Sequence, residues 1–534
     1  MTESALPGIN AFDLDALAED KPDFAVVTFD NTPYPDEVLT YADLVLKGRK
    51  LARAMEKQGF GPGDTFSVMM RNHPEMIIAL YAASALSAIM VPIDPRSKGD
   101  KLSYQLKNSN SRGVIYSAEF MENVTDALSR LPEIETIGVI YKDEFNVALV
   151  PDQPDINDIC DGPEAPAFSP KTYTETDCNM IVYTSGTTGD PKGVRLYNRL
   201  AATASMMQSF WQYTPEDRLY TGLSLTHGNA QSVTMAPSLL LSIPSVISRR
   251  FTKSRIWDIC RKHGCTTFSL LGGMMMGIYS EPVKPDDGDN PVRLVLSAGT
   301  PRPIFEAFEK RFNVTIHEWY GAVEGGFTHK PPGVGPIGSF GNSKGGVYEM
   351  KVVREDESDC DPGEIGELIS RIPGTSPQVN YHGNQDASDA KTYGGWLRSG
   401  DMVHKDEDGW LFFDFRKGGG LRRQGDFIMP EYVEAAIAEH PDVSDICVFG
   451  IPAATEAPGE SDLVAAFVPT GSNPPDIKSV FDLCLDKLER NSVPSYLWVV
   501  EQIPKTASQK NLSRLLKDQF DADVDGVYTF EDYR

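Results

Sequence analysis

Apolar and polar residues follow two different periods along the N-terminal part of the chain. From Thr40 to Gly59 the apolar residues recur at helical spacing, and Asp43, three residues after Thr40, is typical of a capped helix start. Short apolar runs at 66–70, 89–91, 113–116 and 138–141 are typical of buried strands. Strands that alternate with helices predict a largely parallel α/β architecture.

The most apolar helical stretch begins at Met76 and reaches Val91, just before Pro92. It has about 16 residues, fewer than the roughly 20 that cross a bilayer, so we expect a buried helix that leads into a strand and no membrane span. Residues 151–170 are rich in proline and aspartate, which indicates a surface connection.

The pattern changes again near residue 415. Residues 410–415 alternate like a strand, whereas residues 416–425 are basic and glycine-rich without apolar periodicity, which is the composition of a hinge. Residues 430–440 return to helical spacing. Because a chain of 534 residues is too long to fold around a single hydrophobic core, we expect a domain over 1–415 and a smaller one over 416–534.

Charge and cysteine content exclude several classes of protein. A formal net charge of −26 would repel nucleic acid and anionic membranes. Seven dispersed cysteines indicate reduced thiols and not a disulfide framework. The first residues lack the basic and apolar regions of a secretory signal, so the expected location is cytoplasmic.

Residues 183–194 carry the clearest chemical signal, Tyr-Thr-Ser-Gly-Thr-Thr-Gly-Asp-Pro-Lys-Gly-Val. The glycines let backbone N–H groups point at anionic oxygens, the hydroxyls add donors, and Lys192 adds a positive charge. The run 180–183 before the loop predicts a buried strand, and Val194 onward is compatible with a helix. Lys192 precedes Gly193 and no hydroxyl follows, so the spacing is not that of a Walker loop. A flexible surface turn is the alternative interpretation.

This segment resembles the phosphate-binding signature of the adenylate-forming superfamily, which includes acyl-CoA synthetases, peptide-synthetase adenylation domains and firefly-type luciferases. The resemblance covers nearly the whole chain. It implies an α/β fold, with a large N-terminal α/β domain of stacked sheets and a small mobile C-terminal α+β lid domain.

The resemblance also implies roles for individual residues. Glu324, in Tyr320-Gly-Ala-Val-Glu324, would hold Mg²⁺, and Lys510 would bridge the substrate carboxylate and the α-phosphate. His227 lies where the family has an aromatic residue or histidine beside the acyl pocket, and together with Lys192 and Lys510 it is a candidate catalytic residue. The residues implied to bind nucleotide are Thr184, Ser185, Gly186, Thr187, Thr188, Gly189, Lys192, Gly299, Trp319, Tyr320, Gly321, Asp401 and Arg416.

Each of these motifs has a plainer interpretation if the resemblance is set aside. His227 would be a packed core histidine, residues 318–326 an aromatic strand end, Asp401 part of a turn, and Lys510 a solvated lysine. Val323, Gly419 and Gln509 depart from the family pattern.

The implied activity is that of an AMP-forming carboxylic acid:CoA ligase, which uses ATP, Mg²⁺ and coenzyme A and passes through an acyl adenylate. Loading of a carrier protein or an amine is the alternative acceptor chemistry, and a nucleotide-binding homologue without catalysis is the alternative class. The segments placed at the acyl pocket imply a roomy, mainly apolar site for a monocarboxylic acid. The sequence is compatible with a homodimer.

Overall fold

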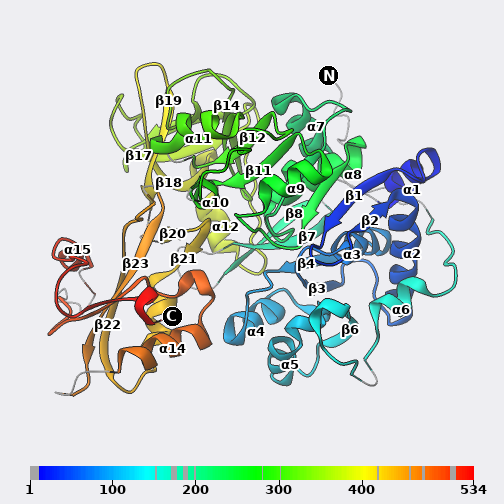
Figure 1. Ribbon diagram of the computed structural model, residues 1–534, viewed down its shortest axis with the longest axis horizontal. Coiled ribbons are helices and arrows are strands. Elements are labelled where there is room, and N and C mark those ends of the chain that lie inside the picture. The colour runs from blue at the N-terminus through cyan, green and yellow to red at the C-terminus, as the bar shows by residue number, and fades with distance from the viewer. Residues whose placement is uncertain are drawn as a thin grey trace.

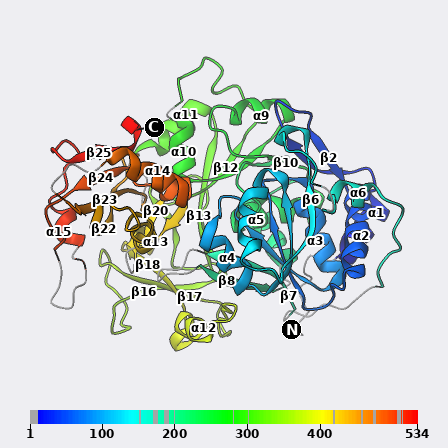
Figure 2. The same ribbon diagram turned by 90° about the horizontal axis from the view of Figure 1, so that it is seen from below.

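The computed structural model of the protein describes residues 11–150, 153–169, 177–184, 191–197, 200–279, 281–300, 302–417, 420–455, 459–471, 476–504, 511 and 513–533. In Figures 1 and 2 the C-terminal segment, coloured orange to red, forms a lobe of its own beside a larger body that holds the rest of the chain. Within the described residues, no helix combines the length and the hydropathy that a membrane crossing requires.

A six-stranded sheet forms one layer of the larger body. Its strands, in sheet order, are β6 (Glu135–Ile140), β5 (Ser111–Ser117), β3 (Thr65–Met69), β4 (Ile89–Ile93), β7 (Cys178–Thr184) and β8 (Lys192–Tyr197). Neighbouring strands are parallel except for β7 and β8, which form an antiparallel hairpin. The helices that follow or flank these strands are α4 (Gly99–Asn108), α5 (Met121–Ser129) and α6 (Ile156–Asp161).

An eight-stranded sheet forms the second layer. Its order is β14 (Gly325–Lys330), β13 (Thr315–Ala322), β12 (Leu294–Ala298), β11 (Thr267–Leu271), β9 (Leu219–Thr221), β10 (Ser245–Ser248), β1 (Ala25–Asp30) and β2 (Glu37–Thr40). The inner strands are parallel and the edge pairs are antiparallel. Its helices are α7 (Leu200–Trp211), α8 (Ala236–Leu241), α9 (Ile256–His263), α10 (Gly272–Tyr279), α11 (Phe305–Phe312) and the π-helical segment η3 (Ala230–Met235).

Helix α3 (Pro74–Leu86) joins the two layers because every one of its residues is buried. Its side chains share one core cluster with Phe29 of β1 and Phe66 of β3. Helix α2 (Tyr41–Lys57), with α1 (Ala11–Asp20) beside it, packs against α3, and Gly48 permits the close approach, since a β-carbon there would lie 2.3 Å from Tyr81 Cδ1. The expected capping box at Thr40 is present.

A third sheet and the C-terminal lobe complete the fold. The third sheet is antiparallel, in the order β15 (Ser339–Asn342), β19 (Trp410–Arg416), β18 (Leu397–Lys405), β17 (Gly366–Arg371) and β16 (Glu349–Val353), with α12 (Gln385–Lys391) before β18. The lobe holds the hairpin β20 (Leu421–Arg423) and β21 (Asp426–Ile428). It also holds the sheet β22 (Val443–Pro452), β23 (Ser461–Pro469), β24 (Tyr496–Val499) and β25 (Val527–Thr529), and helices α13 (Pro430–Ile437), α14 (Ile477–Lys487) and α15 (Ser513–Lys517).

The structure confirms the predicted α/β fold class and corrects two local expectations. Residues from Val194 onward do not start a helix but lie within β8, because their backbone groups pair with those of β7. The segment 151–170 contains the short helix α6, whose Ile156 is buried against Gly138. The predicted buried helix that leads into a strand is confirmed as α3 followed by β4.

Candidate active site

The β7–β8 hairpin holds both ends of the predicted phosphate loop. Thr184, the last residue of β7, pairs with Lys192, the first residue of β8, and its hydroxyl donates to the Lys192 carbonyl at 3.5 Å. Ser185, Gly186, Thr187, Thr188 and Gly189 lie outside the described residues. The pairing of the two strands fixes the position of Thr184 and Lys192, which flank the predicted loop.

Tyr381 links Lys192 to Glu324, although sequence reasoning did not select it. The Lys192 ammonium lies 5.3 Å from the centre of the Tyr381 ring, and the Tyr381 hydroxyl donates to Glu324 Oε1 at 2.9 Å. The backbone of His382 donates to the Gly193 carbonyl at 2.7 Å, which fastens this segment to β8. The structure therefore brings the predicted phosphate-binding lysine and the predicted metal ligand to one aromatic side chain. No motif marks Tyr381, since its position depends on pairing between segments far apart in the sequence.

Tyr320 and Asp401, which are 81 residues apart, also meet. The Tyr320 hydroxyl donates to Asp401 Oδ2 at 2.5 Å, and its ring packs on Phe340 with centroids 4.9 Å apart. Asp401 is 3% exposed and lies opposite Arg416 in the β18–β19 pairing. An aromatic ring, a buried carboxylate and the backbone of Arg416 thus gather at one end of the third sheet.

The other predicted nucleotide-binding residues lie on the carboxyl ends of β12 and β13. Gly299 has φ +75°, and a β-carbon there would be 3.6 Å from Arg422 Nη1 of the lobe. Gly321 follows Tyr320 in β13. Trp319 points to the opposite side of β13 from Tyr320, into a core cluster with Trp211 and Phe327. Its indole nitrogen is buried and has no hydrogen-bond partner.

His227 lies close to the lobe. Burial is the main cause that lowers its pKa, and Arg96 and Arg422 act in the same direction, whereas Asp426 and Asp94 oppose it. The imidazole is therefore neutral near pH 7 and able to accept a proton. Lys510, the third predicted catalytic residue, lies outside the described residues.

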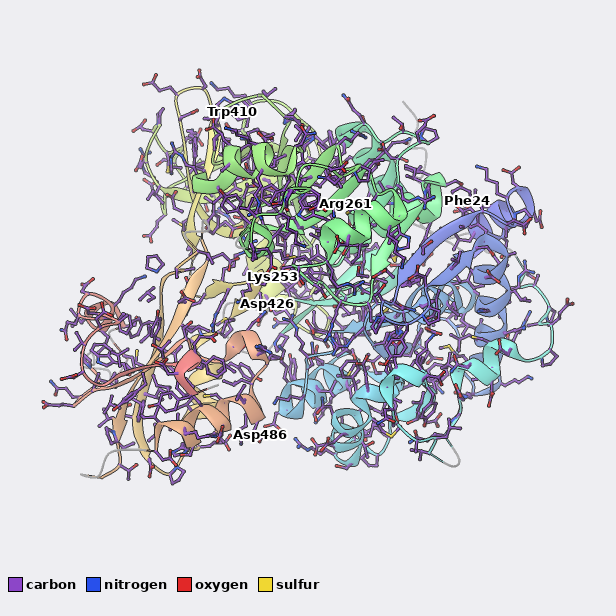
Figure 3. All side chains as sticks on the ribbon, in the orientation of Figure 1. Phe24, Lys253, Arg261, Trp410, Asp426 and Asp486 are labelled. Atoms are coloured by element: carbon purple, nitrogen blue, oxygen red, sulfur yellow. The ribbon has the colours of Figure 1, made fainter. Side chains whose placement is uncertain are left out.

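The β20–β21 hairpin of the lobe lies against the carboxyl end of β11. Gly425, at its turn, has φ +85°, and a β-carbon there would lie 2.6 Å from Leu271 Cδ1. Asp426 forms a two-fold ion pair with Arg96, at 2.5 and 3.0 Å, and Arg96 also pairs with Asp94. Figure 3 shows Asp426 where the lobe meets the larger body. These contacts hold the lobe in an orientation in which its β20–β21 hairpin lies near His227.

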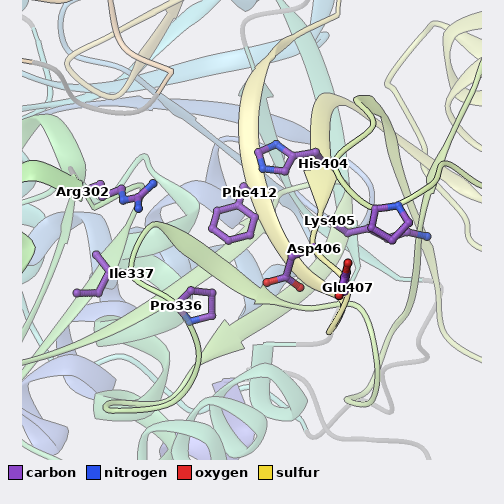
Figure 4. A pocket seen from close by; sticks show the side chains of 10 residues that line it. Arg302, Pro336, Ile337, His404, Lys405, Asp406, Glu407 and Phe412 are labelled. Carbon is purple, nitrogen blue, oxygen red and sulfur yellow. The ribbon is translucent and has the colours of Figure 1, made fainter.

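A separate hollow of about 500 Å³ lies at the turn between β18 and β19 (Figure 4). Its lining includes Arg302, Pro336, His404 and Phe412. It lies at the turn end of the β18–β19 hairpin, whereas Asp401 pairs near the opposite end. None of the predicted site residues that the structure describes lines this hollow, so it is distinct from the described part of the candidate active site.

The fold and the site define a class of enzyme. Lys192 beside a hydroxyl-rich loop, a carboxylate at Glu324, and Tyr320 with buried Asp401 suit a nucleoside triphosphate with its cation. These features are those of a ligase that forms an acyl adenylate.

Comparisons with known proteins agree with this class. The family described as AMP-binding enzyme matches residues 14–378, and its C-terminal domain matches residues 432–510, so the chain belongs to this family, within the adenylate-forming superfamily. Sulfoacetate–CoA ligase of Cupriavidus necator is 28% identical over 493 residues, which cover 90% of this chain and 92% of that protein.

Two solved structures share the fold along nearly the whole chain. A double mutant of o-succinylbenzoate CoA synthetase from Bacillus subtilis, bound with its product analogue OSB-NCoA, matches with a TM-score of 0.79 at 22% identity and covers 96% of this chain and 99% of that chain. The amide bond synthetase McbA from Marinactinospora thermotolerans matches with a TM-score of 0.76 at 20% identity, with the same two coverages.

Proposed function

We propose that this adenylate-forming ligase joins a carboxylic acid to coenzyme A, with ATP as the energy source and AMP and pyrophosphate as products. The observation that carries the proposal is the Lys192–Tyr381–Glu324 arrangement, because it brings the cation at the end of the predicted triphosphate loop and a carboxylate to the same aromatic side chain. The relative from Cupriavidus necator, a CoA ligase by name, supports the choice of acceptor.

In the first step a carboxylate oxygen of the acid attacks the α-phosphorus of ATP, and the bond to pyrophosphate breaks. Lys192 and Lys510 would offset the charge that develops on the phosphate oxygens, as preorganised cations do. Tyr320 would pack on adenine, and Asp401 would accept hydrogen bonds from the ribose hydroxyls while it accepts one from Tyr320. A carboxylate has enough lone pairs for both.

The residues present fit a magnesium ion. Glu324 offers carboxylate oxygens, the ligand type that Mg²⁺ prefers, and the Tyr381 hydroxyl orients that carboxylate at 2.9 Å. When bound, the ion would neutralise phosphate charge. Tyr381 is then a positioning residue for the metal ligand and a neighbour of Lys192.

In the second step the sulfur of the coenzyme A thiol attacks the acyl carbonyl carbon and the thiol proton is released. The bond between the acyl carbon and the phosphate oxygen breaks, so AMP leaves and a thioester forms. We infer that the lobe, residues 416–534, turns about the segment near Arg416 so that Lys510 serves the first step and the β20–β21 hairpin serves the second. The contacts of Gly425 with Leu271 and of Arg422 with Gly299 support this, as does the likeness in fold to a structure that holds a CoA product analogue. A cytoplasmic location and a homodimer stay predictions from the sequence.

An amine is the second candidate acceptor. The likeness in fold to an amide bond synthetase favours it over a carrier protein. One measurement distinguishes the two acceptors. If CoA is the acceptor, addition of free CoA should release AMP and form thioester in a one-to-one ratio. If only an amine discharges the adenylate, the ligase is an amide synthetase.

The experiment that tests the proposal is ATP–pyrophosphate exchange with a broad panel of carboxylic acids. At least one acid should drive exchange, and Lys192→Ala and Glu324→Ala should each reduce it on the order of 10²- to 10³-fold. Lys478→Ala is the control, because that lysine pairs on the surface with Asp482. If none of the acids drives exchange, the remaining interpretation is a nucleotide-binding homologue without catalysis.

A further inference from the structure

Asn229 is a buried carboxamide whose two polar atoms both lack partners. The residue is 7% exposed, and neither Oδ1 nor Nδ2 forms a hydrogen bond. Within the described part of the chain, every other residue with a buried, unpartnered side-chain atom has only one such atom. Burial of a polar group without a hydrogen bond costs free energy, so native proteins rarely leave a whole amide in this state. A group from outside the chain would complete it.

Neighbouring residues place Asn229 near the turn that carries Glu324. Gly228 faces that turn, because a β-carbon there would lie 3.3 Å from Val323 Cγ2, next to Glu324. Ala230 is buried and belongs to the core cluster that also includes Leu271. Asn229 therefore lies between a residue that faces the Glu324 turn and a residue of this apolar core.

The local backbone is also unusual. Asn229 directly precedes the π-helical segment η3, a conformation that is rare and frequent at functional sites. Thr234, about one turn further, bonds Ser269 of β11 at 3.4 Å, which fixes η3 against the sheet. The scaffold beneath Asn229 is thus held by bonds within the chain, whereas its own amide is not.

The chemistry around Asn229 restricts the group that it can bind. Ala230, the next residue, belongs to an apolar core cluster that includes Leu225 and Leu271, and Met274 packs against this cluster. Two cations act on the neighbouring His227, namely Arg96 and Arg422. Arg96 is paired with Asp94 and Asp426, and Arg422 with Glu460 at 3.4 Å, so neither offers a free charge for a second anionic group. A charged substituent would lose its hydration without a counter-ion here. A neutral group that donates or accepts a hydrogen bond suits a carboxamide, because a carboxamide can both donate and accept hydrogen bonds.

We propose that Asn229 binds an uncharged hydrogen-bonding substituent, such as a hydroxyl, keto or carboxamide group, on an otherwise apolar acyl chain or ring. This rests on the proposed function, because it assigns the acid to the same site. It names a substrate class: hydroxylated or similarly substituted monocarboxylic acids, in preference to their unsubstituted analogues.

The test is pyrophosphate exchange with matched pairs of acids, namely benzoic acid with each monohydroxybenzoic acid, and cyclohexanecarboxylic acid with its hydroxylated forms. In at least one pair the wild-type kcat/KM should favour the hydroxylated acid roughly 10- to 100-fold, because the unsubstituted acid leaves the buried amide without its hydrogen-bond partner. Asn229→Leu should abolish that preference and leave the unsubstituted acid as good a substrate as before. Thr234→Val, another buried polar-to-apolar change on η3, should keep the preference.

Thermal unfolding without acid separates a binding role from a structural one. Asn229→Leu should keep or raise Tm, because it removes a buried amide that nothing in the chain satisfies, whereas Thr234→Val should lower Tm. Equal turnover of both members in every pair, or an Asn229→Leu variant with a lowered Tm and equal losses for all acids, would overturn the inference. If no acid of any kind drives pyrophosphate exchange, that result would instead overturn the proposed function.

Discussion

Replacement of Tyr381 by phenylalanine tests the central geometry of the site most directly. The change removes the hydroxyl that donates to Glu324 Oε1 at 2.9 Å and keeps the ring that lies 5.3 Å from the Lys192 ammonium. A hydrogen bond to a charged group contributes about 1.5–3 kcal/mol. Since each 1.36 kcal/mol is a factor of ten in rate, adenylate formation should slow roughly 10- to 100-fold.

The assay is acid-dependent pyrophosphate exchange at several magnesium concentrations. If Tyr381 acts by orienting the metal ligand, the magnesium concentration for half-maximal rate should rise in Tyr381→Phe, and excess magnesium should restore part of the rate. A structural role alone would lower the rate without this shift.

Tyr197→Phe is the matched control. Tyr197 lies on β8 and its hydroxyl accepts from Asn380 Nδ2 at 2.7 Å, one residue before Tyr381, but it contacts neither Lys192 nor Glu324. Its loss should leave exchange within about two-fold of wild type. Equal effects of the two substitutions, or a Tyr381→Phe variant that matches wild type at every magnesium concentration, would refute the assignment.

Three further substitutions test other parts of the structure. Lys510→Ala should block adenylate formation yet still convert supplied acyl adenylate and CoA to thioester; equal loss in both half-reactions would contradict the rotating lobe. Asp401→Ala should raise KM for ATP more than it lowers kcat, because ribose contacts are alike in ground and transition states, and a fall in kcat alone would oppose this. Gly48→Ala should lower the free energy of unfolding by about 1–3 kcal/mol, since its β-carbon would lie 2.3 Å from Tyr81, whereas Gly61→Ala meets nothing within 4 Å; denaturant titration compares them.

The sequence alone predicted the local elements well. Helical spacing after Thr40 and the apolar runs near residues 66, 89, 113 and 138 gave α2, β3, β4, β5 and β6, because burial of one face imposes its period on the residues. The loop at 183–194 also predicted a phosphate-binding chemistry from sequence alone, since glycines, hydroxyls and a lysine are needed together at one place in the chain.

Only the tertiary structure decided how distant residues meet. Val194 has an apolar neighbourhood that suits either a helix or a strand, and its pairing with Val182 made it a strand. Tyr381 lies in the site because its segment pairs with the edge of β8. The lack of hydrogen-bond partners for the Asn229 amide is likewise a property of the folded chain and not of the local sequence. Local composition cannot carry such information, because a hydrogen bond between residues far apart depends on the packing of everything between them.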